Sequence, residues 1–143
     1  MTVPGDCVVD ASVALKWVLE EQGSAEAAML LDGRAIFAPS LVDTEAANAL
    51  WAAARRGEVS RGEAALVFDT FLAAPLRRID LSADLTASAL QIAADLDHPV
   101  YDCVYLAAGL MLDLPVVTAD RRFLVAARRN AELARSVALL GVA

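Results

Sequence analysis

The stretch Cys7-Val8-Val9-Asp10-Ala11-Ser12 is a short apolar run that ends in a carboxylate and continues into a segment with helical spacing. This pattern indicates a buried strand that carries Asp10 at its carboxyl end. In a parallel sheet that edge stays open to a ligand, because the crossover helices cover the two faces. Asp10 is therefore the first candidate site residue, and we expect other parts of the chain to supply its companions.

Strands and helices are expected to alternate along the rest of the chain. Apolar runs predict further strands at 35–38, 77–81, 116–118 and 136–140. Helical spacing, together with capping residues and Gly or Pro stops, predicts helices at about 11–21, 24–31, 40–56, 60–72, 83–96, 102–113 and 121–129. Such alternation implies an α/β fold with a central parallel sheet of four to five strands and helices on both faces. We expect a single domain over residues 1–143.

The composition points to a globular domain without a membrane segment. Hydrophobic residues make up 58% of the chain, but charges interrupt every long apolar stretch well before the roughly 18 to 20 residues that span a bilayer. The N-terminal stretch carries Asp6, Asp10 and Lys16 and has no basic leader, so we expect no signal peptide and a cytoplasmic location. Cys7 and Cys103 are expected to be free buried thiols. The high apolar content favours a partner protein or a homo-oligomer.

The charge distribution is more informative than the net charge of −7. The total argues against a nucleic-acid partner, because such binding depends on Lys and Arg that neutralise phosphates. Eleven of the twelve basic residues are nevertheless Arg, which binds phosphate through two parallel hydrogen bonds. Eight of them form adjacent pairs: Arg55-Arg56, Arg77-Arg78, Arg121-Arg122 and Arg128-Arg129. Phosphate contacts and ordinary surface ion pairs both explain such pairs.

Four acids fall where the predicted topology brings the chain to one edge of the sheet. Asp10 ends the first strand, Asp120 follows another strand by two residues, and Asp102 opens a helix after a loop. Glu45 lies one helical turn into the helix after the second strand. Each acid has a structural alternative, as a helix N-cap or an exposed helix residue. Their common location predicts a cluster of carboxylates.

A cluster of carboxylates needs a compensating charge. Two carboxylates about 4 Å apart repel each other by roughly 4 kcal/mol at an effective dielectric constant near 20. Mg²⁺ prefers oxygen ligands and commonly takes one or two carboxylates directly, with waters completing its shell. An ion held in this way binds a phosphate oxygen and activates a water for in-line attack. The acids therefore predict a site for a divalent cation.

Four stretches, in the same order along the chain, carry a resemblance to a known family. They are Val8–Ser12, Pro39 with Glu45–Leu50, Tyr101–Ala107, and Val117–Asp120 with Phe123. Together they resemble a PIN-domain ribonuclease, and the compact chain is similar to the VapC-type toxins of prokaryotic toxin–antitoxin pairs. The resemblance implies a PIN-like fold and an endoribonuclease that depends on Mg²⁺ or Mn²⁺ and acts as the toxin of a type II pair.

The resemblance also implies roles for the four acids. Asp10, Glu45, Asp102 and Asp120 correspond to the catalytic acids, and Asp10 and Asp102 are the expected metal ligands. Asp120 is expected to hold a water on the ion or a second ion. Glu45 is expected to orient or deprotonate the attacking water.

Five further residues are expected to support these acids or hold the substrate. The Ser12 and Thr118 hydroxyls and the Asn48 amide resemble the polar residues that accompany the acids in the family. Arg121 and Arg122 directly follow Asp120, so they are the arginines best placed to hold an RNA backbone. The resemblance implies a small antitoxin protein and a second copy of the chain as partners.

Two other functions fit the same residues. A receiver-like signalling module binds Mg²⁺ in an acidic pocket and accepts phosphate on an Asp, but it also needs a lysine near the pocket, and Lys16 is the only lysine. A PIN-like domain that binds RNA or protein without catalysis is the third alternative. His98 is the sole histidine, so a mechanism with two histidines is excluded within one chain.

Overall fold

Five parallel strands form one sheet at the centre of the protein. The computed structural model describes residues 5–141. The strands are β1 (Cys7–Val9), β2 (Ile36–Pro39), β3 (Arg77–Ile79), β4 (Val116–Thr118) and β5 (Val137–Leu139). Their order across the sheet is β3-β2-β1-β4-β5, and Val8 of β1 is paired with both Phe37 and Val116. The expected parallel sheet of four to five strands is confirmed.

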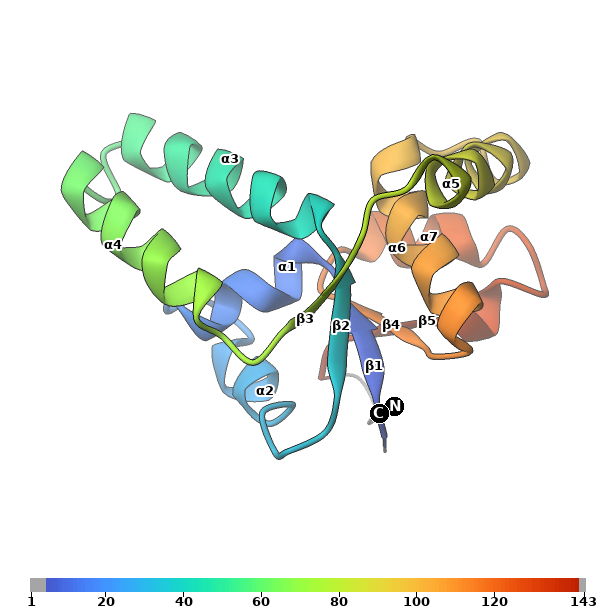
Figure 1. The fold of residues 1–143 in the computed structure, drawn as a ribbon, viewed down its shortest axis with the longest axis horizontal. Helices are drawn as coiled ribbons and strands as arrows, with labels where there is room; N and C mark the ends of the chain where they lie inside the picture. The colour runs from blue at the N-terminus through green and yellow to red at the C-terminus, as the bar shows by residue number, and fades with distance from the viewer. Residues whose placement is uncertain (1–4, 142–143) are drawn as a thin grey trace.

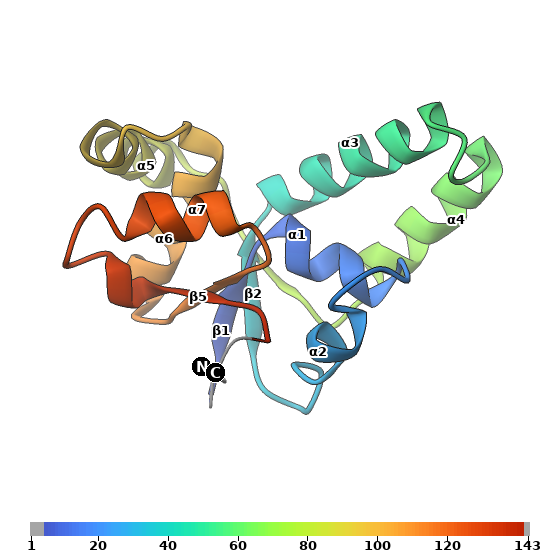
Figure 2. The same cartoon turned by 180° about the vertical axis from the view of Figure 1, so that it is seen from behind.

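Helices cover both faces of this sheet, in two groups (Figures 1 and 2). The first group is α1 (Ala11–Ala14), the short 3-10 helix η1 (Leu15–Trp17), α2 (Ser24–Ala28), α3 (Leu41–Arg55) and α4 (Arg61–Leu72). The second group is α5 (Ala83–Leu96), α6 (Val100–Leu112), α7 (Arg121–Ala127) and the 3-10 helix η2 (Ala134–Ser136). The α3–α4 hairpin extends away from the sheet on one side, whereas α5, α6 and α7 pack together on the other (Figure 1).

The core is densest where α6 lies over the middle of the sheet. All three residues of β1 are fully buried, and every residue of α6 from 103 to 109 is buried as well. Gly109 belongs to this contact, since a Cβ there would lie 2.8 Å from the Leu114 carbonyl oxygen and 2.8 Å from Val116 Cγ2. The close approach of α6 to β4 therefore requires glycine at this position.

Side-chain caps define several of the helix starts. Asp10 caps α1 by accepting a hydrogen bond from Val13 N, and Asp120 caps α7 by accepting from Arg122 N. Ser60 and Glu63 form the reciprocal capping box expected from their spacing. Asp10 and Asp120 therefore have the capping role that was the structural alternative to a role in the site.

The first helix is shorter than its apolar spacing predicts. Helical structure that starts at Ala11 ends with η1 at Trp17, and not near Glu21. The Trp17 indole donates a hydrogen bond to the Ala27 carbonyl oxygen at 2.9 Å, which ties η1 to α2. Gly23, expected to stop the first helix, precedes α2 with a left-handed φ of 91°. A tertiary contact therefore overrides the local helical pattern.

Both cysteines are free and buried, as expected from the sequence. Burial raises the pKa of each thiol to about 11, so neither is a ready nucleophile at neutral pH. Within residues 5–141, no helix is both long enough and apolar enough to cross a membrane.

Substitution of Gly109 by Ala tests the close packing of α6 on β4. The added methyl group meets backbone at 2.8 Å, so we expect a loss of about 2 kcal/mol in the free energy of unfolding, measured by urea denaturation. Gly62→Ala is the matched control, because a Cβ at that α4 position meets no atom within 4 Å. Equal stability of the Gly109→Ala variant and the wild type would show that this packing is loose.

Candidate active site

Asp10 occupies the centre of the carboxyl edge of the sheet, directly after β1. Its side chain is 5% exposed. The Ser12 hydroxyl donates to Oδ1 at 2.5 Å, and the Thr118 hydroxyl at the end of β4 donates to Oδ2 at 2.5 Å. Both oxygens of the Asp10 carboxylate are therefore held by hydroxyl groups, one from each side of the β1–β4 pair.

The direction of these two hydrogen bonds is fixed by the backbone. Ser12 Oγ accepts a hydrogen bond from Ala119 N at 3.0 Å, and Thr118 Oγ1 accepts from Asp120 N at 3.0 Å. A backbone N–H can only donate, so each hydroxyl must direct its single proton elsewhere. That proton points at the Asp10 carboxylate, and this arrangement stabilises the ionised form of the acid.

Burial opposes that stabilisation of the carboxylate. Removal from water raises the pKa of Asp10 from 3.8 to about 6, although the hydrogen bonds from Ser12, Thr118 and the Val13 N–H lower it. The Asp102 carboxylate raises this pKa further by repulsion. Keeping the Asp10 carboxylate ionised therefore costs the folded protein free energy, as is common in sites that bind a cation.

Glu45 enters the same region from the first turns of α3. It is half-buried, and its Oε1 accepts a hydrogen bond from the hydroxyl of Tyr105, a buried residue of α6. Burial raises the pKa of Glu45, and repulsion by Asp102 adds to this effect. Burial and the Glu45 carboxylate raise the pKa of Tyr105, so its phenol stays protonated and donates.

Asp102 faces the cluster from the first turn of α6. Its Oδ2 lies 2.6 Å from Nε2 of His98, and an ionised carboxylate can only accept, so His98 is the donor. The His98 ring stacks on Phe123 of α7, with 5.9 Å between ring centroids and an interplanar angle of 11°. The Phe123 ring thus fixes the imidazole, and the imidazole holds one oxygen of Asp102.

The other predicted site residues are less closely joined to these acids. Asp120 is half-buried and its carboxylate accepts from Arg122 N at 2.9 Å, although its own N–H reaches Thr118. Arg121 and Arg122 are exposed next to it, and Asn48 is exposed on α3. A catalytic role for Asp120 and the roles of these three residues stay predictions.

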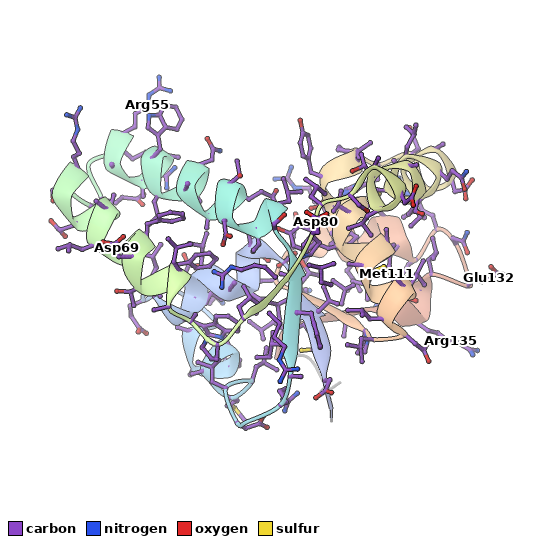
Figure 3. All side chains as sticks on the ribbon, in the orientation of Figure 1. Arg55, Asp69, Asp80, Met111, Glu132 and Arg135 are labelled. Carbon is purple, nitrogen blue, oxygen red and sulfur yellow. The ribbon has the colours of Figure 1, made fainter. Side chains whose placement is uncertain are left out.

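Three of the four arginine pairs take part in structural contacts. Arg55 lies 5.5 Å from the Trp51 ring centroid, Arg78 is 3.0 Å from the Asp43 carboxylate, and Arg129 donates to the Leu96 carbonyl oxygen at 2.6 Å. Figure 3 shows Arg55 at the outer end of α3, far from the carboxyl edge of the sheet. The pair Arg121-Arg122 differs from these three in that it directly follows Asp120, next to the carboxyl edge of the sheet.

The three acids Asp10, Glu45 and Asp102 fit a hard divalent cation by their chemistry. They supply only oxygen donors, and repulsion from Asp102 raises the pKa of both other acids. Among residues 5–141, no three acidic, histidine or cysteine side chains converge closely enough to ligate an ion by themselves. The donor set therefore suits an ion such as Mg²⁺, which keeps several waters and takes one or two carboxylates directly.

Two residues of this site were not assigned a role from the sequence. Tyr105 lies three residues after Asp102 on α6, a spacing that places both on one helix face. His98 lies four residues before Asp102 and holds its carboxylate, although the sequence assigned it no role. The helical spacing from Asp102 was the available signal for Tyr105. The stack on Phe123, which fixes His98, depends on tertiary packing.

A parallel sheet of this order, with acids gathered at its carboxyl edge, defines a PIN-like α/β domain, the class expected from the sequence. The family model described as "PIN domain" matches residues 7–129. The chain therefore belongs to the PIN-domain family. Ribonuclease VapC12 of Mycobacterium tuberculosis is 33% identical over 126 residues, which cover 88% of this chain and 95% of the relative. The resemblance to VapC-type ribonucleases is confirmed.

Solved structures share the same fold. PAE2754 from Pyrobaculum aerophilum superposes with a TM-score of 0.65 at 24% identity, covering 85% of this chain and 86% of its own. VapC20 of Mycobacterium tuberculosis, described as a Sarcin-Ricin loop cleaving toxin, gives 0.63 at 17% identity, with 84% and 94% covered. VapBC2 from Rickettsia felis, bound to a DNA fragment from their promoter, gives 0.66 at 14% identity, with 94% and 98% covered.

Replacement of Asp10 by Asn should stabilise the metal-free protein at neutral pH. The folded-state pKa of about 6 exceeds the usual 3.8, so ionised Asp10 costs the folded state up to about 3 kcal/mol above pH 6. In EDTA at pH 7.5 we expect the variant to have the higher Tm by a few degrees, because removal of the buried charge outweighs the roughly 1 kcal/mol lost where the amide NH2 replaces the acceptor of one hydroxyl proton. The difference should shrink as the pH falls through 6 and vanish near pH 3, below the usual pKa of 3.8, where wild-type Asp10 is mostly protonated in both states. A lower Tm for the variant at pH 7.5 would contradict this view of Asp10.

Proposed function

We propose that the protein is an endoribonuclease of a toxin–antitoxin pair that hydrolyses RNA phosphodiester bonds with the help of Mg²⁺ or Mn²⁺. The observation that carries this proposal is the group of Asp10, Glu45 and Asp102 at the carboxyl edge of a PIN-family sheet. The ribonuclease name of the VapC12 relative supports RNA as the substrate.

In this proposal each acid has a distinct task. Asp10 and Asp102 would hold the divalent ion, which would act as a Lewis acid toward the phosphate and activate water for attack. Glu45 orients the attacking water or takes its proton. A raised pKa suits that task, since it makes the carboxylate a better base. Asp120 completes the acidic edge from the start of α7.

The hydroxyl and phenol donors keep these acids in position. Ser12 and Thr118 direct their protons at Asp10, so its carboxylate cannot rotate freely. Tyr105 does the same for one oxygen of Glu45 and leaves the other oxygen available. Preorganised groups of this kind reduce the rearrangement needed on the way to the transition state. Arg121 and Arg122 are placed to hold the RNA backbone beside Asp120.

Partner proteins form part of the same proposal. We propose a small antitoxin protein that masks the site and a second copy of this chain as partners. The VapBC2 structure, which has the same fold, supports an antitoxin. Large apolar side chains that are mostly exposed, such as Trp51 at 57% and Leu66 at 67% on the α3–α4 hairpin, support burial against other proteins.

A cleavage assay with matched variants tests the chemistry. We expect labelled structured and unstructured RNAs to be cut in Mg²⁺ or Mn²⁺ and to stay intact in EDTA. Asp10→Asn and Asp102→Asn should each lower the cleavage rate by roughly a hundredfold or more. Asp95→Asn, at an exposed position of α5, is the control that should retain full activity.

Four outcomes would contradict this proposal. Cleavage in EDTA would exclude the metal-dependent mechanism, and full activity of Asp10→Asn would exclude the assigned acids. A lasting acyl phosphate formed from a small phosphodonor would instead support the receiver-like alternative. The absence of cleavage in all metal conditions, with RNA binding retained, would support a binding domain without catalysis.

His98 is a positioning residue for Asp102 in this scheme. His98→Phe keeps an aromatic ring against Phe123 but removes the N–H that holds Asp102. We expect about tenfold weaker Mn²⁺ binding, measured by electron paramagnetic resonance, and a lower kcat with little change in KM. The Tm should stay close to that of the wild type because the ring stack is kept. Unchanged Mn²⁺ affinity would show that His98 only packs against α7.

A further inference from the structure

A cavity of about 430 Å³ opens beside the acidic cluster, outside the carboxyl ends of β4 and β5. Residues from η1, from the turn before α2, from α2 and from the start of α7 line it. The lining comprises Lys16, Glu21, Gln22, Gly23, Glu26, Ala119, Arg121, Leu139, Leu140 and Gly141. Four of these side chains are charged, and they come from both sides of the sheet.

The cavity lies where ligands bind in open α/β sheets. β1 and β4 are neighbours, but the chain leaves β1 toward one face and β4 toward the other (Figures 1 and 2). Such a switch in direction opens a crevice at the carboxyl edge. Ala119 lines the cavity, and its N–H donates to Ser12, which in turn holds Asp10. The crevice therefore adjoins the proposed active site at Ala119.

Lys16 is already fixed in this cavity. Its side chain is only 13% exposed, and its Nζ lies 3.3 Å from Oε1 of Glu21. The aliphatic part of the side chain runs along the backbone of Gly23, since a Cβ there would approach Lys16 Cδ and Cε to 3.3 Å. A lysine that has lost most of its freedom before binding loses little more entropy when a ligand arrives.

The second cation of the cavity is Arg121, which is exposed at the start of α7. Arg121 and Lys16 thus reach the same cavity from helices on opposite faces of the sheet. Glu21, the acid paired with Lys16, has a side chain that is 44% exposed. An exposed ion pair of this kind contributes about 0 to 1 kcal/mol, so a phosphate can replace the Glu21 carboxylate at small cost.

We propose that this cavity binds the RNA phosphate next to the scissile one, between Lys16 and Arg121, and that Glu21 releases Lys16 when the RNA enters. The inference rests on the proposed function, because an RNA strand cut at Asp10 must continue into an adjoining crevice. Lys16 thereby has a role in substrate binding. Glu21 competes with the substrate for Lys16, and together with Glu26 it balances the charges of Lys16 and Arg121 in the lining when RNA is absent.

RNA binding by a catalytically disabled protein tests this subsite. In the Asp10→Asn background, the affinity for a labelled single-stranded RNA is measured by fluorescence anisotropy at several salt concentrations. Lys16→Met keeps the aliphatic stem over Gly23, and we expect roughly tenfold weaker binding. The slope of log affinity against log salt should fall in magnitude by about 0.7, the value for one phosphate contact on a single strand. Arg121→Gln should behave in the same way.

The remaining variants separate the subsite from general charge effects. Glu21→Gln should tighten binding, since the competitor of the phosphate is lost. Lys16→Arg, which keeps the positive charge, should bind RNA with an affinity close to that of the parent Asp10→Asn protein. Arg135→Gln carries the same change in charge in η2, which precedes β5, whereas the cavity lies at the carboxyl end of that strand, so affinity and salt slope should stay unchanged. A Tm measurement confirms that each variant is folded.

The possible outcomes test the subsite, the competition by Glu21 and the proposed function separately. If Lys16→Met and Arg121→Gln bind RNA like Arg135→Gln, the subsite is wrong, while metal-dependent cleavage by the wild type would leave the proposed function intact. Weaker binding by Glu21→Gln would overturn the competition between Glu21 and phosphate. If the Asp10→Asn protein binds no RNA and the wild type cuts none, the subsite and the proposed function both fail.

Discussion

One buried carboxylate, that of Asp10, determines how the rest of the site is built. An ionised acid that is 5% exposed must have its oxygens occupied by donors, and the Ser12 and Thr118 hydroxyls supply them. Thr118 ends β4, so the same hydrogen bond that holds the acid also joins the carboxyl ends of the two central strands. Because backbone N–H groups fix the direction of both hydroxyls, the geometry depends on the ladder between β1 and β4. The pairing of β1 with β4 and the position of the Asp10 carboxylate therefore depend on each other.

The acidic edge works against stability, and the opposite part of the core compensates. Asp102 raises the pKa of Asp10 and of Glu45, which means that the charged forms repel one another. Below this edge α6 lies close to β4 at Gly109 and is buried along most of its length. A tightly packed element resists displacement, so α6 keeps Asp102 and Tyr105 near the other acids despite the repulsion.

The sequence predicted the parts of the molecule that depend on local patterns. Strands, caps and the placement of acids at strand ends follow from apolar runs and from the parallel topology, so the cluster around Asp10 was expected. The end of the first helix was predicted wrongly, because a hydrogen bond from Trp17 to the Ala27 carbonyl oxygen lies outside any local pattern. For the same reason the contact of His98 with Asp102 was missed, as it depends on Phe123 packing behind the imidazole. The detailed orientation of Asp120 also required the structure, since its carboxylate is directed to its own helix.

The strand order β3-β2-β1-β4-β5 determines when the catalytic centre can assemble during synthesis on the ribosome. β1 is synthesised first of the five strands, but its partner β4 is completed only at Thr118, after β2 and β3. Until then Asp10 lacks the Thr118 hydroxyl, and α6, which also packs on β1 and β2, lacks its contact with β4. A nascent or truncated chain therefore has no assembled catalytic centre. For a member of a ribonuclease family, this order of synthesis delays assembly of the catalytic centre until the strand that carries Thr118 has been translated.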